Sequence, residues 1–137
     1  MIEERAKRKL SGILSADAVG YSRHMQEDEI STIRTLEASK TLMSKLIQQF
    51  KGRVVDAVGD NLLAEFNSVV DATECAVKIQ QELNTRNAEL PHDKRMEFRI
   101  GINLGDVIEN GGTIYGNGVI IAARLEKLAK PLIRIPF

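Results

Sequence analysis

Apolar residues fall at every second position within residues 97–108 (EFRIGINLGDVI), in the second half of the chain. This alternation is the period of a β-strand with one buried face. A shorter apolar stretch at residues 10–19 predicts another strand. Residues 54–66 contain two short apolar runs separated by Gly59, Asp60 and Asn61. Two such runs around turn-forming residues predict a β-hairpin with Asp60 at its tip.

Two long segments instead place apolar residues three and four positions apart, which predicts amphipathic helices. The first is Glu27–Phe50, with Gly52 as its expected C-cap. The second runs from Ser68, an expected N-cap, to about Asn87. A third helix is expected over Val119–Ala129, which is rich in small residues.

The resulting element order is strand, helix, hairpin, helix, strand pair, helix and strand. We expect an α+β fold in which the helices pack on one face of a largely antiparallel sheet. The order fits a ferredoxin-like core, in which the first strand lies beside the central hairpin. The length of 137 residues predicts a single domain. It comprises an N-terminal segment at 1–9, a core at 10–130 and a tail at 131–137.

Composition excludes several classes of function. Nineteen basic and nineteen acidic residues cancel, so no overall field favours nucleic acid. Cys75 is the only cysteine, which excludes a disulfide framework and a thiolate metal site. No apolar run reaches the length of a membrane span, and the first ten residues lack the apolar centre of a signal peptide. We therefore expect a cytoplasmic protein, or the cytoplasmic part of one, without membrane contact.

Two aspartates are the first candidates for chemistry. Asp17 ends the first predicted strand and precedes Gly20, Tyr21 and Ser22, a loop that offers backbone N–H groups to an anion. Either aspartate alone is equally well explained by a turn that faces water. A ferredoxin-like core brings Asp17 and Asp60 together, however, and two adjacent carboxylates repel unless a cation lies between them. Such hard oxygen ligands suit Mg²⁺ or Mn²⁺ and suggest metal-assisted chemistry on a nucleoside triphosphate.

Four motifs carry a resemblance to a known family. They are SADAVGYS, VGDNLLAEF, RIGINLGDVI and GVIIAARLE, in this order. Together, from about Leu10 to Ala129, they resemble the class III nucleotidyl cyclases, which are adenylate and guanylate cyclase catalytic domains, here of bacterial type. The resemblance implies a head-to-tail homodimer with active sites at the interface. It also implies conversion of ATP, and in second place GTP, to the 3′,5′-cyclic nucleotide and pyrophosphate in cyclic nucleotide signalling.

The resemblance also implies roles for individual residues. Asp17 and Asp60 match the two aspartates that hold two divalent metal ions, with the backbone carbonyl of Ala18 as a further ligand. One ion activates the ribose 3′-hydroxyl, and both hold the phosphates. Backbone groups of Gly20–Ser22 would contact the terminal phosphates. Arg124 matches the arginine that stabilises charge on the reacting phosphate; its alternative role is a salt bridge on a helix surface.

Three departures from the family pattern bear on activity. Ile120 stands where the family has a ribose-orienting Asn, and isoleucine cannot donate a hydrogen bond. Asp56 stands in place of the purine-reading Lys, while Thr113 aligns with the partner of that Lys, so base selectivity is open. The family domain continues through further elements that this chain lacks. Residues 132–137 are therefore expected to mark a truncated or divergent tail.

These departures leave alternatives to an active enzyme. The second hypothesis is a degenerate cyclase homology domain that dimerises or binds a nucleotide and acts in regulation without efficient catalysis. A third hypothesis is a plain ferredoxin-like interaction module. Metal-dependent nucleotide binding would exclude that third hypothesis, because an interaction module has no need of both aspartates.

Overall fold

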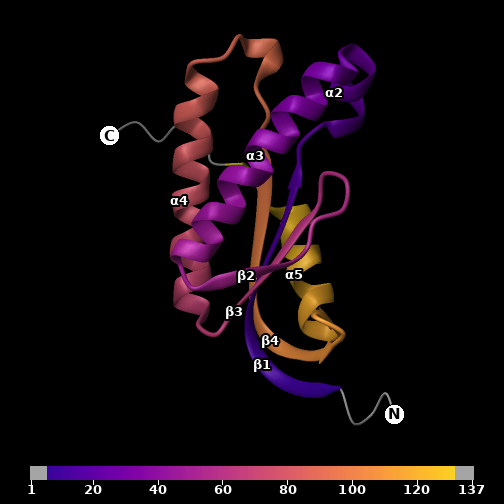
Figure 1. The fold of residues 1–137 in the computed structure, drawn as a ribbon, viewed down its shortest axis with the longest axis vertical. Helices are drawn as coiled ribbons and strands as arrows, with labels where there is room; N and C mark the ends of the chain where they lie inside the picture. Colours follow the sequence, from indigo (N-terminus) through magenta and orange to yellow (C-terminus); the bar gives the residue numbers. More distant parts are fainter. Residues whose placement is uncertain (1–5, 132–137) are drawn as a thin grey trace.

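A computed structural model describes residues 6–131 of the protein. The elements follow one another along the chain in the expected order, with one additional helix after the first strand (Figure 1). The elements are β1 (Lys7–Ala18), α2 (Tyr21–Glu27), α3 (Glu29–Gln49), β2 (Gly52–Asp56), β3 (Leu62–Phe66), α4 (Val69–Ala88), a short 3₁₀ helix (His92–Lys94), β4 (Phe98–Asn110), β5 (Thr113–Tyr115) and α5 (Asn117–Leu128).

The strands form one antiparallel sheet in the order β2-β3-β1-β4-β5. The first strand therefore lies beside the hairpin formed by β2 and β3, as the ferredoxin-like core requires. Ala16 is paired with Leu62 of β3, at the start of the strand that follows the hairpin turn, and Asp17 is paired with Arg99 of β4. The α+β fold with an antiparallel sheet is confirmed.

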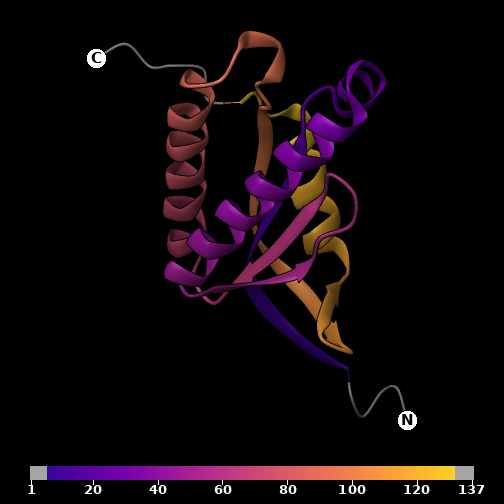
Figure 2. The same ribbon diagram turned by 45° about the horizontal axis from the view of Figure 1, so that its top comes forward.

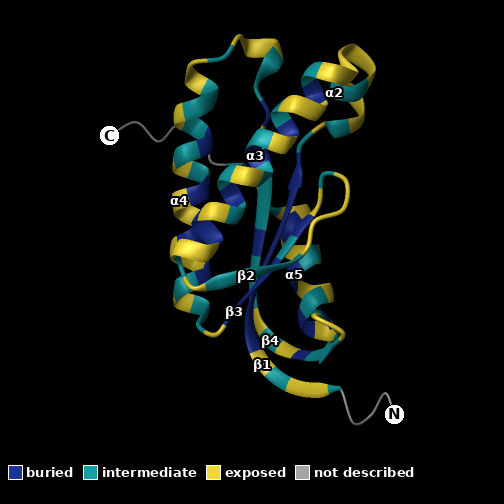
Figure 3. Ribbon diagram, viewed as in Figure 1, coloured by how far each residue is buried: buried dark blue, intermediate teal, exposed yellow. Residues whose placement is uncertain are grey.

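The two long helices, α3 and α4, cover one face of the sheet, as predicted (Figure 2). Alternate residues of β1, such as Leu14 and Ala16, face them in the main core. The intervening residues face the shorter α5, which contacts β1 and β4 from the other side. A smaller core forms there, and the buried colouring of β1 in Figure 3 reflects this cover on both faces. Its fully buried members are Ile13, Val107, Ile114 and Ala122.

The helix expected over Glu27–Phe50 is α3, which begins two residues later, at Glu29. An additional helix, α2, occupies residues 21–27, and Asp28 adopts an extended conformation between α2 and α3. The Asp28 carboxylate accepts a hydrogen bond of 3.1 Å from the Ser31 amide, so Asp28 is the N-cap of α3. This capping aspartate lies just before the apolar repeat and separates α3 from α2, a helix that the sequence pattern did not predict.

The prediction that Gly52 caps this helix is also wrong. Lys51 takes the left-handed conformation after the helix, with φ of 66°, and Gly52 begins β2. A Cβ atom at Gly52 would lie 2.4 Å from the Phe66 ring, so glycine is required here for packing. Ser68 does cap α4, since its hydroxyl accepts hydrogen bonds from the Val70 and Asp71 amides.

The remaining elements match their predictions, apart from small shifts at their ends. β1 begins at Lys7 rather than Leu10 because its first residues pair with the far end of β4. The last strand of the expected order would fall in the tail, and residues 132–137 lie outside the described residues. Within residues 6–131, no helix is both long and apolar enough to cross a membrane.

Candidate active site

Asp17 lies near the end of β1, buried to 4% exposure, on the face toward α5. Pairing with β4 places Arg99 directly beside it. The Arg99 guanidinium donates to both carboxylate oxygens, at 2.9 Å from Nε and 2.6 Å from Nη2, and Lys127 Nζ donates to Oδ2 at 2.7 Å. Burial alone would raise the pKa of Asp17, but the hydrogen bonds from Arg99 and Lys127 outweigh it and lower that pKa below 3.8. Asp17 is therefore a carboxylate at neutral pH.

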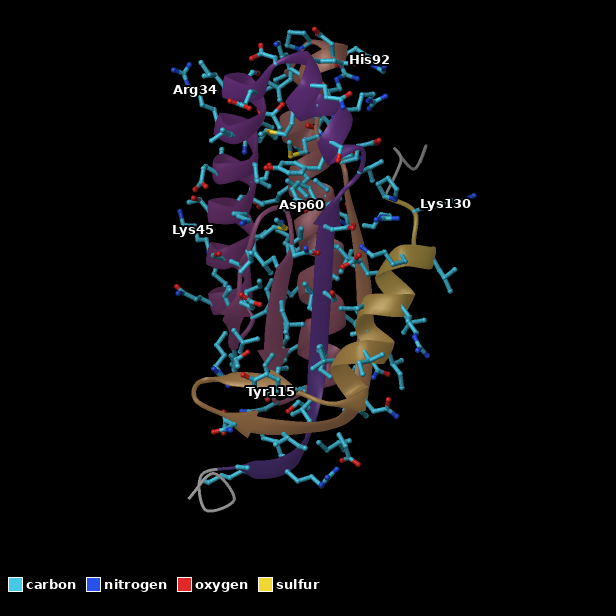
Figure 4. All side chains as sticks on the ribbon, turned by 90° about the vertical axis from the view of Figure 1, so that its right-hand side faces the viewer. Arg34, Lys45, Asp60, His92, Tyr115 and Lys130 are labelled. Atoms are coloured by element: carbon cyan, nitrogen blue, oxygen red, sulfur yellow. The ribbon has the colours of Figure 1, made fainter. Side chains whose placement is uncertain are left out.

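Asp60 approaches the same point from the hairpin turn. Gly59, with φ of 58°, allows the tight turn between β2 and β3. The Asp60 carboxylate then accepts a hydrogen bond of 3.2 Å from the backbone amide of Ala18, the residue that follows Asp17. Figure 4 shows Asp60 beside β1. The hydrogen bond to Asp17 is the main reason why the pKa of Arg99 is raised, and the charge of Asp60 adds to the rise.

A second buried carboxylate, Glu126, lies behind Asp17. Its Oε1 accepts a hydrogen bond of 2.9 Å from Ser15, and its Oε2 lies 3.0 Å from Lys127 Nζ. This second contact is an ion pair without good hydrogen-bond geometry, since Oε2 has no hydrogen-bond partner. Burial raises the pKa of Glu126, and the charge of Asp17 raises it further. The Lys127 ammonium group thus contacts both acidic side chains.

Sequence reasoning missed Arg99, Glu126 and Lys127. Arg99 and Asp17 are 82 positions apart and belong to strands whose exact pairing the sequence does not give. The two α5 residues follow directly after the GVIIAARL part of the fourth motif. The available signal was Glu126, because this charged residue lies at the i+4 spacing of the small residues Gly118 and Ala122, which face the sheet. These three side chains surround Asp17 with charge on the α5 side.

Arg124 is exposed on α5 and forms no ion pair with another residue in the range 6–131. The alternative of a surface salt bridge therefore finds no partner in that range. Ile120 lies one helical turn earlier and is 48% exposed. The i, i+4 spacing places both on one side of α5. The structure does not bring Arg124 into contact with Asp17 or Asp60.

The candidate phosphate-binding residues lie just beyond β1. Gly20 has φ of 65° and precedes α2, whose first two residues are Tyr21 and Ser22. Only Val19 separates Gly20 from Ala18, whose amide contacts Asp60. The loop is therefore continuous with the two aspartates.

The two base-pocket positions lie at strand ends. Asp56 is the exposed last residue of β2, and Thr113 is the half-buried first residue of β5. β2 and β5 are the two outer strands of the sheet, yet they contact each other. The sheet is curled at this end, and the curl brings the elements that carry the two positions together.

The donor chemistry of the site suits a hard divalent cation. The Asp60 carboxylate contacts the amide of Ala18, the residue that follows Asp17, and the two carboxylates and the Ala18 carbonyl are all oxygen donors. No group of three or more His, Cys, Asp or Glu side chains forms a metal cluster in residues 6–131. Two carboxylates and a carbonyl do not need a third such side chain. Because Arg99 donates to both oxygens of Asp17 and Lys127 to one of them, a cation at Asp17 would compete with both basic side chains.

A fold with two aspartates at the junction of its first strand and central hairpin defines a candidate nucleotide-processing domain. The sequence profile of the Adenylate and Guanylate cyclase catalytic domain matches residues 5–135. The chain belongs to this family and is a class III nucleotidyl cyclase domain, as the four motifs predicted.

Individual relatives agree with this assignment. A Rhizobium meliloti protein named "Putative adenylate cyclase 3" is 45% identical over 132 residues, which are 96% of this chain and 22% of that protein. An adenylate cyclase of Streptomyces coelicolor is 31% identical over 93% of this chain and 32% of its own length. The crystal structure of an adenylate/guanylate cyclase/hydrolase from Silicibacter pomeroyi is 38% identical, with a TM-score of 0.84 over 92% of this chain and 74% of that chain. The chain thus spans between a fifth and a third of the two curated relatives.

Proposed function

We propose that the chain is the catalytic domain of a nucleotidyl cyclase that forms a 3′,5′-cyclic nucleotide and pyrophosphate. The proposed substrate is ATP, with GTP in second place. Two Mg²⁺ or Mn²⁺ ions are the proposed cofactors, and the active sites are proposed to lie at the interface of a cytoplasmic homodimer. The observation that carries the proposal is the hydrogen bond from the Ala18 amide to Asp60, which joins the hairpin tip to the residue after Asp17.

The proposed division of labour follows from the positions of the side chains. Asp17, Asp60 and the Ala18 carbonyl would hold the metal ions, which when bound lower the pKa of the attacking hydroxyl and neutralise phosphate charge. The loop Gly20–Ser22 directly follows these ligands and would contact the terminal phosphates. Arg124 is exposed and free of ion pairs within residues 6–131. Its guanidinium is therefore available to a phosphate group of the proposed nucleotide substrate.

Two features support ATP and the homodimer. The curated relatives described above carry the name adenylate cyclase, which favours ATP over GTP. The side of α5 that bears Arg124 also exposes large apolar side chains, which a second subunit would cover. They are Ile120, Ile121, Leu125 and Leu128.

The second candidate function is a degenerate cyclase homology domain that acts in regulation. Ile120 favours it, because it offers no hydrogen bond to the ribose. Asp56 favours it as well, since a carboxylate at the exposed end of β2 reverses the charge of the purine-reading lysine.

The deciding experiment measures cyclic nucleotide formation from ATP and from GTP with Mn²⁺, at protein concentrations where the dimer forms. Asp60→Ala is the test variant, and Asp93→Ala, which removes an exposed carboxylate in the 3₁₀ helix, is the matched control. We expect product from the parent and from Asp93→Ala, and none from Asp60→Ala. Equal product from Asp60→Ala would contradict the proposed role of Asp60.

Absence of product from the parent with both nucleotides would favour the regulatory domain. Equilibrium binding of ATP with Mn²⁺ then separates the remaining hypotheses. Binding that depends on Asp60 supports a degenerate cyclase domain. A chain that binds neither metal nor nucleotide is the plain interaction module.

A further inference from the structure

The curled end of the sheet is closed by one arginine. Arg53 of β2 donates a hydrogen bond of 2.9 Å to the carbonyl of Gly112, in the turn between β4 and β5. Its Nη2 contacts Glu109 of β4 at 2.8 Å, and its Nε donates to Glu65 of β3 at 3.0 Å. The Arg53 guanidinium therefore links β2, one outer strand, to its neighbour β3 and to the β4–β5 hairpin. This hairpin carries the other outer strand, β5. Figure 4 shows this hairpin, near Tyr115, folded across the end of the sheet.

The acceptors of Arg53 are themselves held in place. Glu65 is buried to 4% exposure and accepts a hydrogen bond of 2.7 Å from Ser11. Lys9 lies 3.1 Å from Glu65 and 3.4 Å from Glu109. Burial alone would raise the pKa of Glu65, but contacts with Ser11, Lys9 and Arg53 outweigh it and lower that pKa. Glu65 is therefore a carboxylate at neutral pH.

Both base-pocket positions adjoin this closure. Asp56 lies three residues after Arg53 on β2, and Thr113 directly follows Gly112. Their neighbours Val55 and Ile114 pack in the same small core on the α5 side of the sheet. The placement of the two positions relative to each other thus depends on this small core and on the hydrogen bonds of Arg53.

We propose that Arg53 is a positioning residue that fixes positions 56 and 113 relative to each other and thereby sets the discrimination between adenine and guanine nucleotides. This inference rests on the proposed function, which assigns these positions to the base pocket. Arg53 acts through the β4–β5 turn and does not touch the nucleotide. Arginine is required because its planar fork serves three acceptors at once, whereas the lysine ammonium has no such fixed geometry.

The test compares Arg53→Met, Arg53→Lys and Glu109→Gln with the parent. Arg34→Met is the matched control, because Arg34 is exposed on α3, on the helix-covered side of the molecule. Three quantities are measured: kcat and KM for ATP and GTP with Mn²⁺, competition of ATP and GTP for a bound fluorescent nucleotide, and amide hydrogen exchange of residues 110–114. Glu109→Gln keeps the buried Glu65 paired and guards against a variant that fails to fold.

We expect faster exchange at residues 110–114 in Arg53→Met. We also expect a change of roughly two- to tenfold in the ATP-to-GTP ratio of KM, the range of one hydrogen bond to a base, with a smaller change in kcat. Arg53→Lys and Glu109→Gln should lie between Arg53→Met and the parent, and Arg34→Met should match the parent. A merely structural role would lower kcat for both nucleotides equally and leave their ratio unchanged.

The outcomes separate the two proposals. Product formation with an ATP-to-GTP ratio that Arg53→Met leaves unchanged overturns the positioning role and leaves the cyclase function intact. A parent without product, whose binding ratio still shifts in Arg53→Met, overturns catalysis and supports the positioning role. A parent that binds neither nucleotide overturns both.

Discussion

The substitution Gly101→Ala, which adds one methyl group to β4, tests how closely α5 must approach the sheet. Gly101 lies in β4 opposite Ser15. A Cβ atom built there would lie 2.3 Å from the Ala122 carbonyl oxygen and 2.3 Å from the Glu126 amide nitrogen, both in the backbone of α5. Backbone atoms in the middle of a helix cannot move aside individually. Gly101→Ala must therefore displace the helix as a unit, by about 1 Å to restore ordinary contact distances.

The expected cost follows from the size of this collision. Overpacking of a well-filled interior costs about 1–3 kcal/mol. Without the collision, the substitution would stabilise the protein. Gly→Ala at an unstrained backbone position stabilises the folded state by about 0.4–1 kcal/mol, because it reduces the conformational entropy of the unfolded chain. For a chain of this size each kcal/mol shifts the Tm by roughly 3–6 °C. We expect Gly101→Ala to lower the Tm by roughly 3–18 °C.

The assay is thermal and urea denaturation of the parent, Gly101→Ala and Gly101→Val, followed by circular dichroism. Strand propensity favours Val over Ala, and both over Gly. The collision predicts the opposite order, with Gly most stable and Val least stable. A Gly101→Ala variant as stable as the parent would refute the close approach of α5. Displacement of α5 also moves Lys127 away from Asp17, so we expect activity to fall together with stability.

Three further predictions concern single side chains. Asp17→Asn should lower the unfolding free energy by about 1–2 kcal/mol at pH 7. Because the folded-state pKa of Asp17 is lowered, this difference should vanish as the pH falls below 3.8 and through that lowered value; a pH-independent difference would contradict the ion pairing. Burial raises the pKa of Cys75 to about 12, so thiol reagents should modify it only as fast as the chain unfolds, and rapid labelling of folded protein would disprove its burial. Ile120→Asn should raise kcat, by up to roughly 10²-fold, in the cyclic nucleotide assay, and no gain would argue against a ribose contact at this position.

Local patterns in the sequence determined most of the fold. The alternation in residues 97–108 identified β4, and the hairpin around Asp60 and the Ser68 cap were found where expected. Each of these signals depends on side chains a few positions apart, so the sequence contains all the information needed. The same reasoning did not predict α2 and failed at Gly52. A glycine packed under the ring of Phe66, far away in the sequence, produces no local signal.

The sequence by itself also determined the family and the candidate metal ligands, because these rest on residue types in order along the chain. Tertiary structure alone decided what surrounds Asp17. Arg99, Lys127 and Glu126 reach it from β4 and α5, and their charges set its pKa. Tertiary structure alone also decided that Arg53 joins β2 to the β4–β5 hairpin. Electrostatic energies depend on distances in space, and strand register and helix approach fix those distances only after the whole chain has folded.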